Sequence, residues 1–263
     1  MLLCPVCNAA LETNGRVMAC GNGHSFDIAK EGYVNLLRSN KNGDKIGDDK
    51  YSARSRRDFL NKGYYAPLRD ALCEIFAKHQ GSVLDICCGE GYYTSALGEN
   101  PSLQVYGFDI AREMIRLAAK RGNGTYFVAN MASIPVPDSS FDYAIHLFAP
   151  FHEPEFARIL KPGGSLYTVI PGQFHLFGLK QALYDTPYEN DEKLPQTDVL
   201  QLVGTQKVTA TIELRSPEDI ESVFRMTPYY FHTSQADREK LAAYEMLQTP
   251  IEFVIAHYQK PEV

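Results

Sequence analysis

A glycine turn that follows a run of apolar residues constrains the fold of this chain more than any other feature. Residues 83–91 read Val-Leu-Asp-Ile-Cys-Cys-Gly-Glu-Gly, and a second apolar segment, 103–109, ends in Asp109. A strand that runs into a glycine turn and a helix, with an acid at the end of the next strand, is the local plan of a nucleoside-cofactor site. We therefore expect such a site at the carboxyl ends of these two strands.

Strand-like and helix-like segments alternate through the rest of the chain, which predicts an α/β fold with a mostly parallel sheet and helices on both faces. The expected strands are 83–87, 103–109, 125–129, 141–148, 165–170, 206–214 and 251–258. The expected helices are 51–79, 91–98, 111–121, 153–160, 217–225 and 235–247. Residues 161–164, Lys-Pro-Gly-Gly, are expected to end one helix and turn the chain into the strand at 165.

The size and composition of the chain limit the kind of domain that can contain this site. The chain has 263 residues, 44% of them hydrophobic, which is enough for the core of one α/β domain and a small appendage. It has no apolar run of about eighteen residues and no signal-peptide layout, so we expect a cytoplasmic protein with no membrane partner. The polar, glycine-containing segment 38–50 is predicted to link an N-terminal unit to the main domain, 51–263.

The net charge of −6 is unevenly distributed along the chain. Residues 1–80 hold 12 Lys/Arg and 9 Asp/Glu, whereas residues 81–263 hold 14 and 23. The front of the chain is therefore the better candidate to contact phosphate groups, and Arg54, Arg56 and Arg57 are clustered there. A solvated helix face explains these arginines equally well.

Three cysteines and one histidine near the N-terminus have the spacing of a zinc site. Cys4 and Cys7 form a Cys-x2-Cys pair, and Cys20 and His24 form a Cys-x3-His pair. Four such ligands close a tetrahedral shell, as in structural zinc sites, whereas a catalytic zinc needs an open position. We predict a structural zinc ribbon over 1–37 that is too short to fold without the ion and that recognises substrate. A disulfide is not expected in a reducing compartment.

Two further sequence motifs accompany the glycine turn within residues 83–171. Residues 130–142 read Asn-Met-Ala-Ser-Ile-Pro-Val-Pro-Asp-Ser-Ser-Phe-Asp, and residues 160–164 read Leu-Lys-Pro-Gly-Gly. With the turn, they resemble the class I S-adenosylmethionine-dependent methyltransferases. That resemblance implies a Rossmann-like seven-stranded sheet with an antiparallel last strand, S-adenosylmethionine as cofactor, and Asn130 beside the adenine. It does not identify the substrate, because the fold hosts many.

The predicted cofactor site combines backbone and side-chain contacts. Gly89 and Gly91 let the backbone approach the ligand, and Asp109 can accept hydrogen bonds from both ribose hydroxyls. Asp85 lies in the strand that leads into the loop. Class I enzymes usually have glycine where this chain has Cys87, so we expect weaker cofactor affinity or a shifted loop there. No partner base is evident for a reactive thiol at this position.

Segments on either side of this block narrow the resemblance. Together with the zinc pattern, they resemble the RlmA family, which are 23S ribosomal RNA guanine-N1 methyltransferases. The segments concerned are 26–37, 56–60, 63–68, 89–94 and 148–150. The resemblance extends to the C-terminus and implies that the substrate is a hairpin of 23S ribosomal RNA or an assembling large subunit, and that the protein forms a homodimer.

The RlmA resemblance also implies roles for individual residues. It assigns the structural zinc to Cys4, Cys7, Cys20 and His24, and it assigns cofactor contacts to Tyr65, Gly89, Glu90 and His175. Tyr65 precedes the first strand and His175 follows the fifth, so both can reach the edge of the sheet where ligands bind. A packed tyrosine and a hydrogen-bonded core histidine are the alternatives.

The segment that follows the fourth strand is the expected acceptor site. Phe148 or Phe151 could stack on a flipped guanine, and His152 or Glu153 could accept the proton that leaves guanine N1. The alternative is that Phe148 belongs to the core and that His152 and Glu153 simply begin a helix.

Two other functions remain compatible with the sequence. A small-molecule methyltransferase would act without RNA, and its zinc ribbon would have no part in recognising substrate. A non-catalytic RNA-binding protein with a degenerate cofactor fold would fail to bind S-adenosylmethionine, and Cys87 is the residue that raises this alternative.

Overall fold

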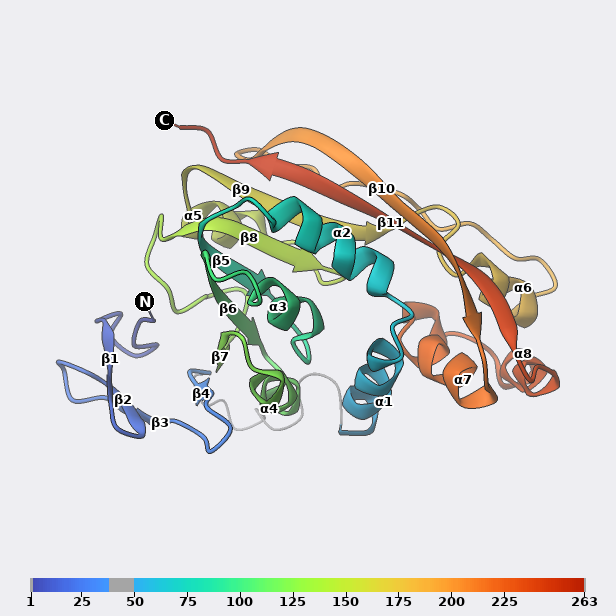
Figure 1. Cartoon of the computed structure of the whole chain (residues 1–263), viewed down its shortest axis with the longest axis horizontal. Coiled ribbons are helices and arrows are strands. Elements are labelled where there is room, and N and C mark those ends of the chain that lie inside the picture. The colour runs from blue at the N-terminus through green and yellow to red at the C-terminus, as the bar shows by residue number, and fades with distance from the viewer. Residues whose placement is uncertain (1, 38–49, 263) are drawn as a thin grey trace.

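A single mixed sheet forms the centre of the molecule in the computed structural model, which describes residues 2–37 and 50–262 (Figure 1). All seven strands expected from the sequence are present, and a short eighth strand from the N-terminal unit extends the sheet. In spatial order the strands are β10 (Gln201–Leu214), β11 (Leu247–Gln259), β9 (Leu160–Pro171), β8 (Phe141–Leu147), β5 (Gly81–Ile86), β6 (Leu103–Asp109), β7 (Thr125–Val128) and β4 (Val34–Asn35).

Strand direction confirms the predicted class I topology. Strands β5 to β9 pair in parallel, while β11 is antiparallel to both of its neighbours, β9 and β10. β4 pairs in parallel with β7, where Val34 lies opposite Phe127. The N-terminal unit therefore contributes directly to the main sheet.

The helices agree with most of the predicted ranges. They are α1 (Lys50–Asn61), α2 (Ala66–Phe76), α3 (Tyr92–Leu97), α4 (Arg112–Arg121), α5 (Glu153–Ile159), α6 (Phe177–Leu183), α7 (Pro217–Arg225) and α8 (Gln235–Lys240), with 3-10 turns η2 (Pro228–Phe231) and η3 (Leu241–Ala243). The prediction of a single helix over 51–79 is wrong. The chain turns at Gly63, which has a φ of +80° and lies between α1 and α2. The helix expected over 235–247 ends early, and α6 was not expected.

The Lys-Pro-Gly-Gly segment also differs from its prediction. Helix α5 ends at Ile159, and residues 161–164 lie within β9 rather than in a turn that precedes it. The register between β8 and β9 shifts between Phe141 and Tyr143, which accommodates these residues at the start of the strand. The left-handed backbone of Gly163 (φ +73°) lies in this irregular stretch.

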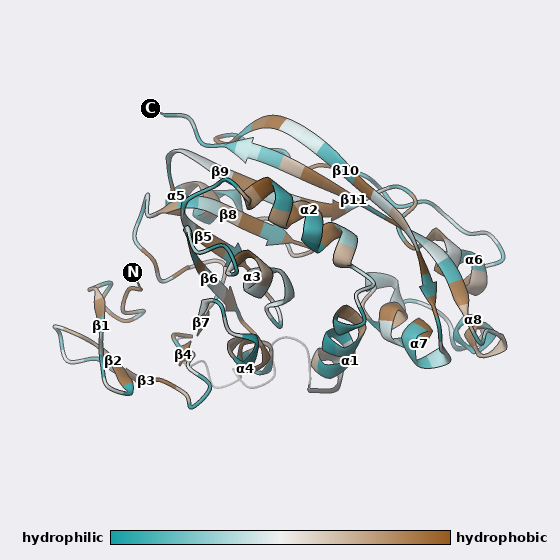
Figure 2. Cartoon of the chain, viewed as in Figure 1, coloured by the Kyte–Doolittle hydropathy of each residue, from teal (hydrophilic) through white to brown (hydrophobic). Residues whose placement is uncertain are grey.

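Alternating residues of the strands pack into two different layers. Val83 and Val105 face a cluster that contains residues of α2, α3, α6 and α7. Leu84 and Phe108 face the other cluster, which contains residues of α5 and of the N-terminal unit. Helices therefore cover both faces as predicted, and in Figure 2 the central strands are largely apolar whereas helices such as α1, α4 and α7 carry hydrophilic stretches.

The N-terminal unit is a small antiparallel sheet that is docked on the second layer. It comprises β1 (Leu11–Asn14), β2 (Val17–Cys20) and β3 (Ser25–Asp27). The backbone N–H of Leu3 donates to the carbonyl of Pro135 at 2.8 Å, and β4 adds the strand pairing with β7. Of the predicted linker 38–50, residues 38–49 lie outside the described residues.

Among the described residues, no helix is both long and apolar enough to cross a membrane.

Candidate active site

A cavity of about 320 Å³ lies at the carboxyl ends of β5 and β6, where the sequence predicts the cofactor. We call it the cofactor cavity. Five of the predicted cofactor residues line it: Tyr65, Asp85, Gly89, Glu90 and Asp109. The structure therefore brings together residues from the start of α2, from the glycine loop and from the end of the second predicted strand.

The two predicted glycines have different physical roles. Gly89 has a φ of +55°, and a Cβ built there would meet no protein atom within 4 Å, so its backbone is open to a ligand. Gly91 has a φ of +79° and is the N-cap of α3. A Cβ at Gly91 would lie 2.8 Å from the Cβ of Ala118, so this glycine lets α3 pack closely on α4.

Two carboxylates are held at the strand ends. Asp109 Oδ2 accepts from the backbone N–H of Gly89 at 3.1 Å, and Oδ1 accepts from that of Ala111 at 2.8 Å. Asp109 thereby fixes the loop that connects β5 to α3. Asp85 is buried and accepts from Thr94 Oγ1 at 2.5 Å. Burial raises the pKa of Asp85 to about 7 despite the hydroxyl partner.

Glu90 is engaged by a neighbouring helix. Its buried carboxylate accepts from Arg121 Nε at 2.5 Å and from Nη2 at 2.9 Å. Burial raises the pKa of Glu90, and the guanidinium partly offsets that rise. The bidentate pair directs both carboxylate oxygens to Arg121.

Tyr65 joins the cofactor cavity to His175. Its hydroxyl lies 3.2 Å from His175 Nε2, and His175 Nδ1 accepts from the backbone N–H of Glu252 at 3.3 Å. Burial lowers the pKa of His175 to about 3, so the ring is neutral and its one proton is on Nε2. The Tyr65 oxygen then accepts from His175, which leaves the phenolic proton available for a ligand.

Cys87 adopts the backbone conformation that glycine usually has in this loop. Its φ is +58°, and its thiol points to Met131, with Sγ and Sδ 3.8 Å apart. Burial raises the pKa of the thiol to about 12, so Cys87 is a neutral group at physiological pH. Cys88 is buried as well, and its pKa is also raised.

A second cavity, of about 510 Å³, adjoins the first. We call it the acceptor cavity. The two cavities share Arg56, Tyr65, Phe148, Ala149 and Met226, so they meet along a common wall. Among its described lining residues the charged groups are two arginines, Arg56 and Arg225, and there is no aspartate or glutamate. His175 lines this cavity rather than the first.

Phe148 stands on the common wall in a strained backbone conformation. It has a φ of +56°, and 45% of it is exposed. The buried His146, which was not among the residues expected from the sequence, supports this turn: Nδ1 lies 2.9 Å from Thr168 Oγ1 and Nε2 lies 3.2 Å from the carbonyl of Pro150. Burial lowers the pKa of His146 to about 4, which keeps the ring neutral. A histidine between two apolar residues near the end of a predicted strand was the available signal.

His152 and Glu153 lie outside the described linings of both cavities. His152 is the N-cap of α5, where its Nδ1 accepts from the backbone N–H of Glu155. The carboxylate of Glu153 accepts from three backbone N–H groups of residues 198–200 at 2.8–2.9 Å. The geometry thus favours support of a loop over proton transfer, and the catalytic role of both residues stays a prediction.

Asn130 lies along a third cavity, between the N-terminal unit and the sheet. Its Oδ1 accepts from the backbone N–H of Ala132 at 3.0 Å. Ile110 lines both this cavity and the cofactor cavity, so the two cavities adjoin, but Asn130 lies outside the described lining of the cofactor cavity. Its contact with adenine stays a prediction.

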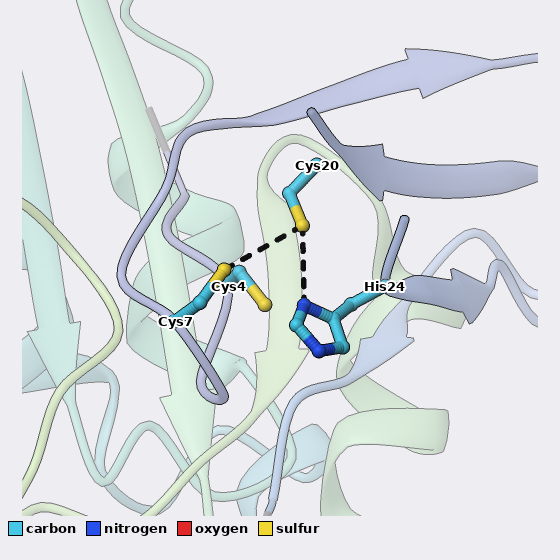
Figure 3. Close-up of side chains that lie close together, drawn as sticks. All are labelled: Cys4, Cys7, Cys20 and His24. Carbon is cyan, nitrogen blue, oxygen red and sulfur yellow. Dashed lines mark hydrogen bonds between the residues drawn. The ribbon is translucent and has the colours of Figure 1, made fainter. Parts of the chain in front are cut away.

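The side chains of Cys4, Cys7, Cys20 and His24 converge at the N-terminus (Figure 3). Their ligand atoms all lie within 4.8 Å of one another, and Sγ of Cys7 and of Cys20 are 3.7 Å apart. Zn–S bonds of about 2.3 Å in a tetrahedron place two sulfurs about 3.8 Å apart, so the donor set fits zinc. Asn22 donates to Cys7 Sγ, which lowers the pKa of that thiol to about 6 and favours the thiolate that a metal requires.

Comparison with known proteins agrees with both units. The family model described as RlmA, N-terminal, matches residues 2–43, and a methyltransferase domain model matches residues 83–164. A protein of Streptomyces fradiae named 23S rRNA (guanine(748)-N(1))-methyltransferase is 36% identical over 190 residues, which are 69% of this chain and 67% of the relative. YxjB of Bacillus subtilis, provisionally named for the same guanine-N1 activity, is 32% identical over 71% of this chain and 70% of its own.

A solved structure supports the fold. One chain of the complex between the Haloferax volcanii Trm112 methyltransferase activator and its methyltransferase partner aligns with 82% of this chain and all of its own, with a TM-score of 0.50 and 16% identity. The methyltransferase domain uses S-adenosylmethionine, and the ribbon carries structural zinc. From its ribbon, its methyltransferase domain and its similarity to relatives over about 70% of their length, the chain belongs to the RlmA family of methyltransferases.

Proposed function

We propose that this protein transfers a methyl group from S-adenosylmethionine to N1 of a guanine in a hairpin of 23S ribosomal RNA. The observation that carries this proposal is the pair of adjoining cavities with unlike charge. One is lined by three carboxylates and one arginine and suits a cationic cofactor. The other has two arginines and, in its described lining, no carboxylate, and it suits an anionic nucleotide. The names of the relatives supply the base and the atom.

The residues of the cofactor cavity would bind and orient the methyl donor. Asp109 accepts from the ribose hydroxyls, the Gly89 backbone lies against the ligand, and the Tyr65 hydroxyl donates to its carboxylate. S-adenosylmethionine supplies a methyl group on an activated sulfonium. Because the donor needs no further activation, alignment with the acceptor nitrogen provides most of the rate enhancement.

The acceptor cavity would hold the target base outside its RNA helix. A flipped guanine can stack on Phe148 or Phe151, since both rings line the cavity. Phe148 also lines the cofactor cavity, so a base stacked on it is adjacent to the methyl donor. A cation near the base favours the anionic form of guanine, and Arg56 and Arg225 supply that charge.

The proton on guanine N1 must leave during the reaction, and several groups are candidates to accept it. The sequence suggests His152 and Glu153. Their hydrogen bonds at the start of α5 favour a structural role, in which they hold the backbone near the acceptor cavity. Water and backbone carbonyls at the cavity wall are the remaining acceptors.

RNA outside the base would be held by the front of the chain. We infer that the zinc ribbon, 1–37, and the arginines at 54, 56 and 57 contact the phosphate backbone, while the domain over 51–263 performs the chemistry. A homodimer and an assembling subunit as substrate agree with the resemblance. Ribosomal RNA of bacteria such as the relatives' is made in the cytoplasm, so we place the protein there.

The test is transfer of a labelled methyl group to 23S RNA that lacks the modification. We expect the label in 1-methylguanosine, and mapping of the labelled nucleotide identifies the target. No label in RNA, with cofactor binding confirmed in the same sample, would refute the proposal.

A small-molecule acceptor is the second candidate. The chain is 31% identical to a demethylmenaquinone methyltransferase of Anoxybacillus flavithermus, over 47% of this chain and 58% of that protein. That alignment excludes about half of the chain, so it supports a shared methyltransferase domain. Transfer to a quinone precursor under the same conditions, without transfer to RNA, would favour this candidate.

A further inference from the structure

An exposed phenylalanine stands at the acceptor cavity, away from the wall that the cavity shares with the cofactor. Phe231 ends the short turn η2 and lines the cavity, yet 77% of it is exposed. Single exposed apolar residues are common on protein surfaces. This ring differs because it combines exposure with a place at the opening of a cavity sized for a nucleotide.

The turn that carries Phe231 is firmly held. Thr227 Oγ1 donates to the carbonyl of Phe224 at 2.6 Å, and Thr233 Oγ1 donates to that of Tyr229 at 2.8 Å. Arg238 donates to the carbonyls of Tyr230 and Thr233. Because the backbone on both sides of the ring is fixed, a ligand that stacks on it orders little of the chain.

Guanidinium groups lie over the neighbouring aromatic ring, that of Tyr230. Arg225 and Arg238 lie over the ring of Tyr230, at 5.1 and 4.5 Å from its centroid, and Tyr230 packs edge-on against Phe231 at 5.3 Å. Glu221 pairs with Arg225 at 2.6 Å, whereas Arg238 contacts backbone carbonyls and the Tyr230 ring. An exposed ring next to a tyrosine that carries two guanidiniums matches the base and phosphate of a nucleotide.

We propose that Phe231 is a stacking platform for the RNA nucleotide adjacent to the target guanine, whose phosphates face Arg225 and Arg238. This inference rests on the proposed function, because it needs a flipped guanine in the acceptor cavity. Flipping separates the target from its neighbour, which exposes a base face for Phe231 to cover. Phe231 is then a determinant of substrate recognition that touches RNA and makes no contact with the cofactor.

The experiment compares variants of Phe231 in methyl transfer to a 23S RNA hairpin. We expect F231A and F231L to lower kcat/KM for RNA about tenfold, because base stacking on an aromatic ring is lost in both. F231W should keep most of the activity, and the affinity for S-adenosylmethionine should be unchanged in all three. F174A is the matched control, because Phe174 is also exposed (43%) but lines neither cavity.

A change in the RNA completes the test. Removing the base next to the target, on either side in turn, should lower transfer by the wild-type protein, and on one side F231A should cause no additional loss. Full activity of F231L would overturn the proposal, and so would an equal loss of activity in F174A. The proposal would also fail if F231A and base removal had multiplicative effects on both sides of the target. If the wild-type protein labels no RNA at all, the proposed function fails first, which is distinguishable from a labelled RNA that Phe231 does not affect.

Discussion

The cofactor cavity and the acceptor cavity share a wall and are opposite in charge. Asp85, Glu90 and Asp109 line the first and Arg56 lines both, whereas the described lining of the second adds Arg225 and has no carboxylate. S-adenosylmethionine carries a sulfonium and an ammonium group, and RNA carries phosphates. The difference therefore separates the two reactants by charge, and Phe148, which is neutral, is placed where they meet.

The largest effect that would test this comparison is expected at Asp109. Asp109→Ala removes the acceptor for the ribose hydroxyls and also the two backbone hydrogen bonds that fix the loop. Hydrogen bonds to a charged group contribute about 1.5–3 kcal/mol each, so we expect S-adenosylmethionine affinity to fall a hundredfold or more (about 3 kcal/mol). Calorimetric titration measures the loss. RNA affinity without cofactor should be unchanged, and a parallel loss there would mean that the cavities do not act separately.

The cavities also differ in how far the sequence predicts them. Asp85, Gly89 and Asp109 lie in one continuous block, and the rule that ligands bind at strand ends places them together. Parts of the acceptor cavity come from α7, η2 and residue 190, which are distant in sequence from the strand-end block, and the strand that follows them, β11, pairs between β9 and β10. No local pattern encodes that long-range pairing.

Two departures from the predicted elements have local causes. Gly63 breaks the helical periodicity of 51–79, and its left-handed backbone was not apparent from the pattern alone. Helix α6 has seven residues and follows Leu176, whose φ is +57°. Helices α3 and α5 are as short, but one follows a glycine N-cap and the other has a proline in its first turn, whereas α6 has neither signal at its start.

The second prediction concerns the common wall. Phe148→Gly removes the ring and relieves the left-handed strain at this residue, so the free energy of unfolding should stay within about 1 kcal/mol of wild type. Turnover on RNA should fall about tenfold or more, because a stacked base loses its support. Single-turnover rates at saturating cofactor measure it. Phe148→Ala serves as the control, since it lacks the ring but keeps the strain, and a recovery of turnover in the glycine variant alone would assign the role to the backbone.

The third prediction uses the raised pKa of Asp85. Its pKa is about 7 in the folded protein and near 3.8 when unfolded, so its contribution to stability is present below pH 4 and is lost as pH rises through 7. Without cofactor, Asp85→Asn should therefore match wild type at low pH and be more stable above pH 7, by up to about 4 kcal/mol. Urea unfolding at several pH values measures this difference.

Cofactor binding should show the opposite dependence at Asp85. A cationic ligand favours the ionised carboxylate, so wild-type affinity for S-adenosylmethionine should increase as pH rises through 7. Asp85→Asn should remove most of that increase. An affinity that is flat with pH in the wild type would mean that Asp85 does not face the cation, and the charge contrast would then rest on Asp109 and Glu90.

The smallest effect on chemistry is expected at Glu153, which the sequence suggests as a base. Three backbone hydrogen bonds lower the pKa of Glu153 in spite of its partial burial, so it is ionised at neutral pH and holds residues 198–200. Glu153→Gln should destabilise the protein by about 1–3 kcal/mol and lower turnover only a few-fold, with the pH profile unchanged. A loss of turnover near a hundredfold, with the acid limb of the profile removed and stability retained, would instead make Glu153 the base. Proton removal at the acceptor cavity would then depend on the carboxylate of Glu153, although its hydrogen bonds to residues 198–200 indicate a structural role.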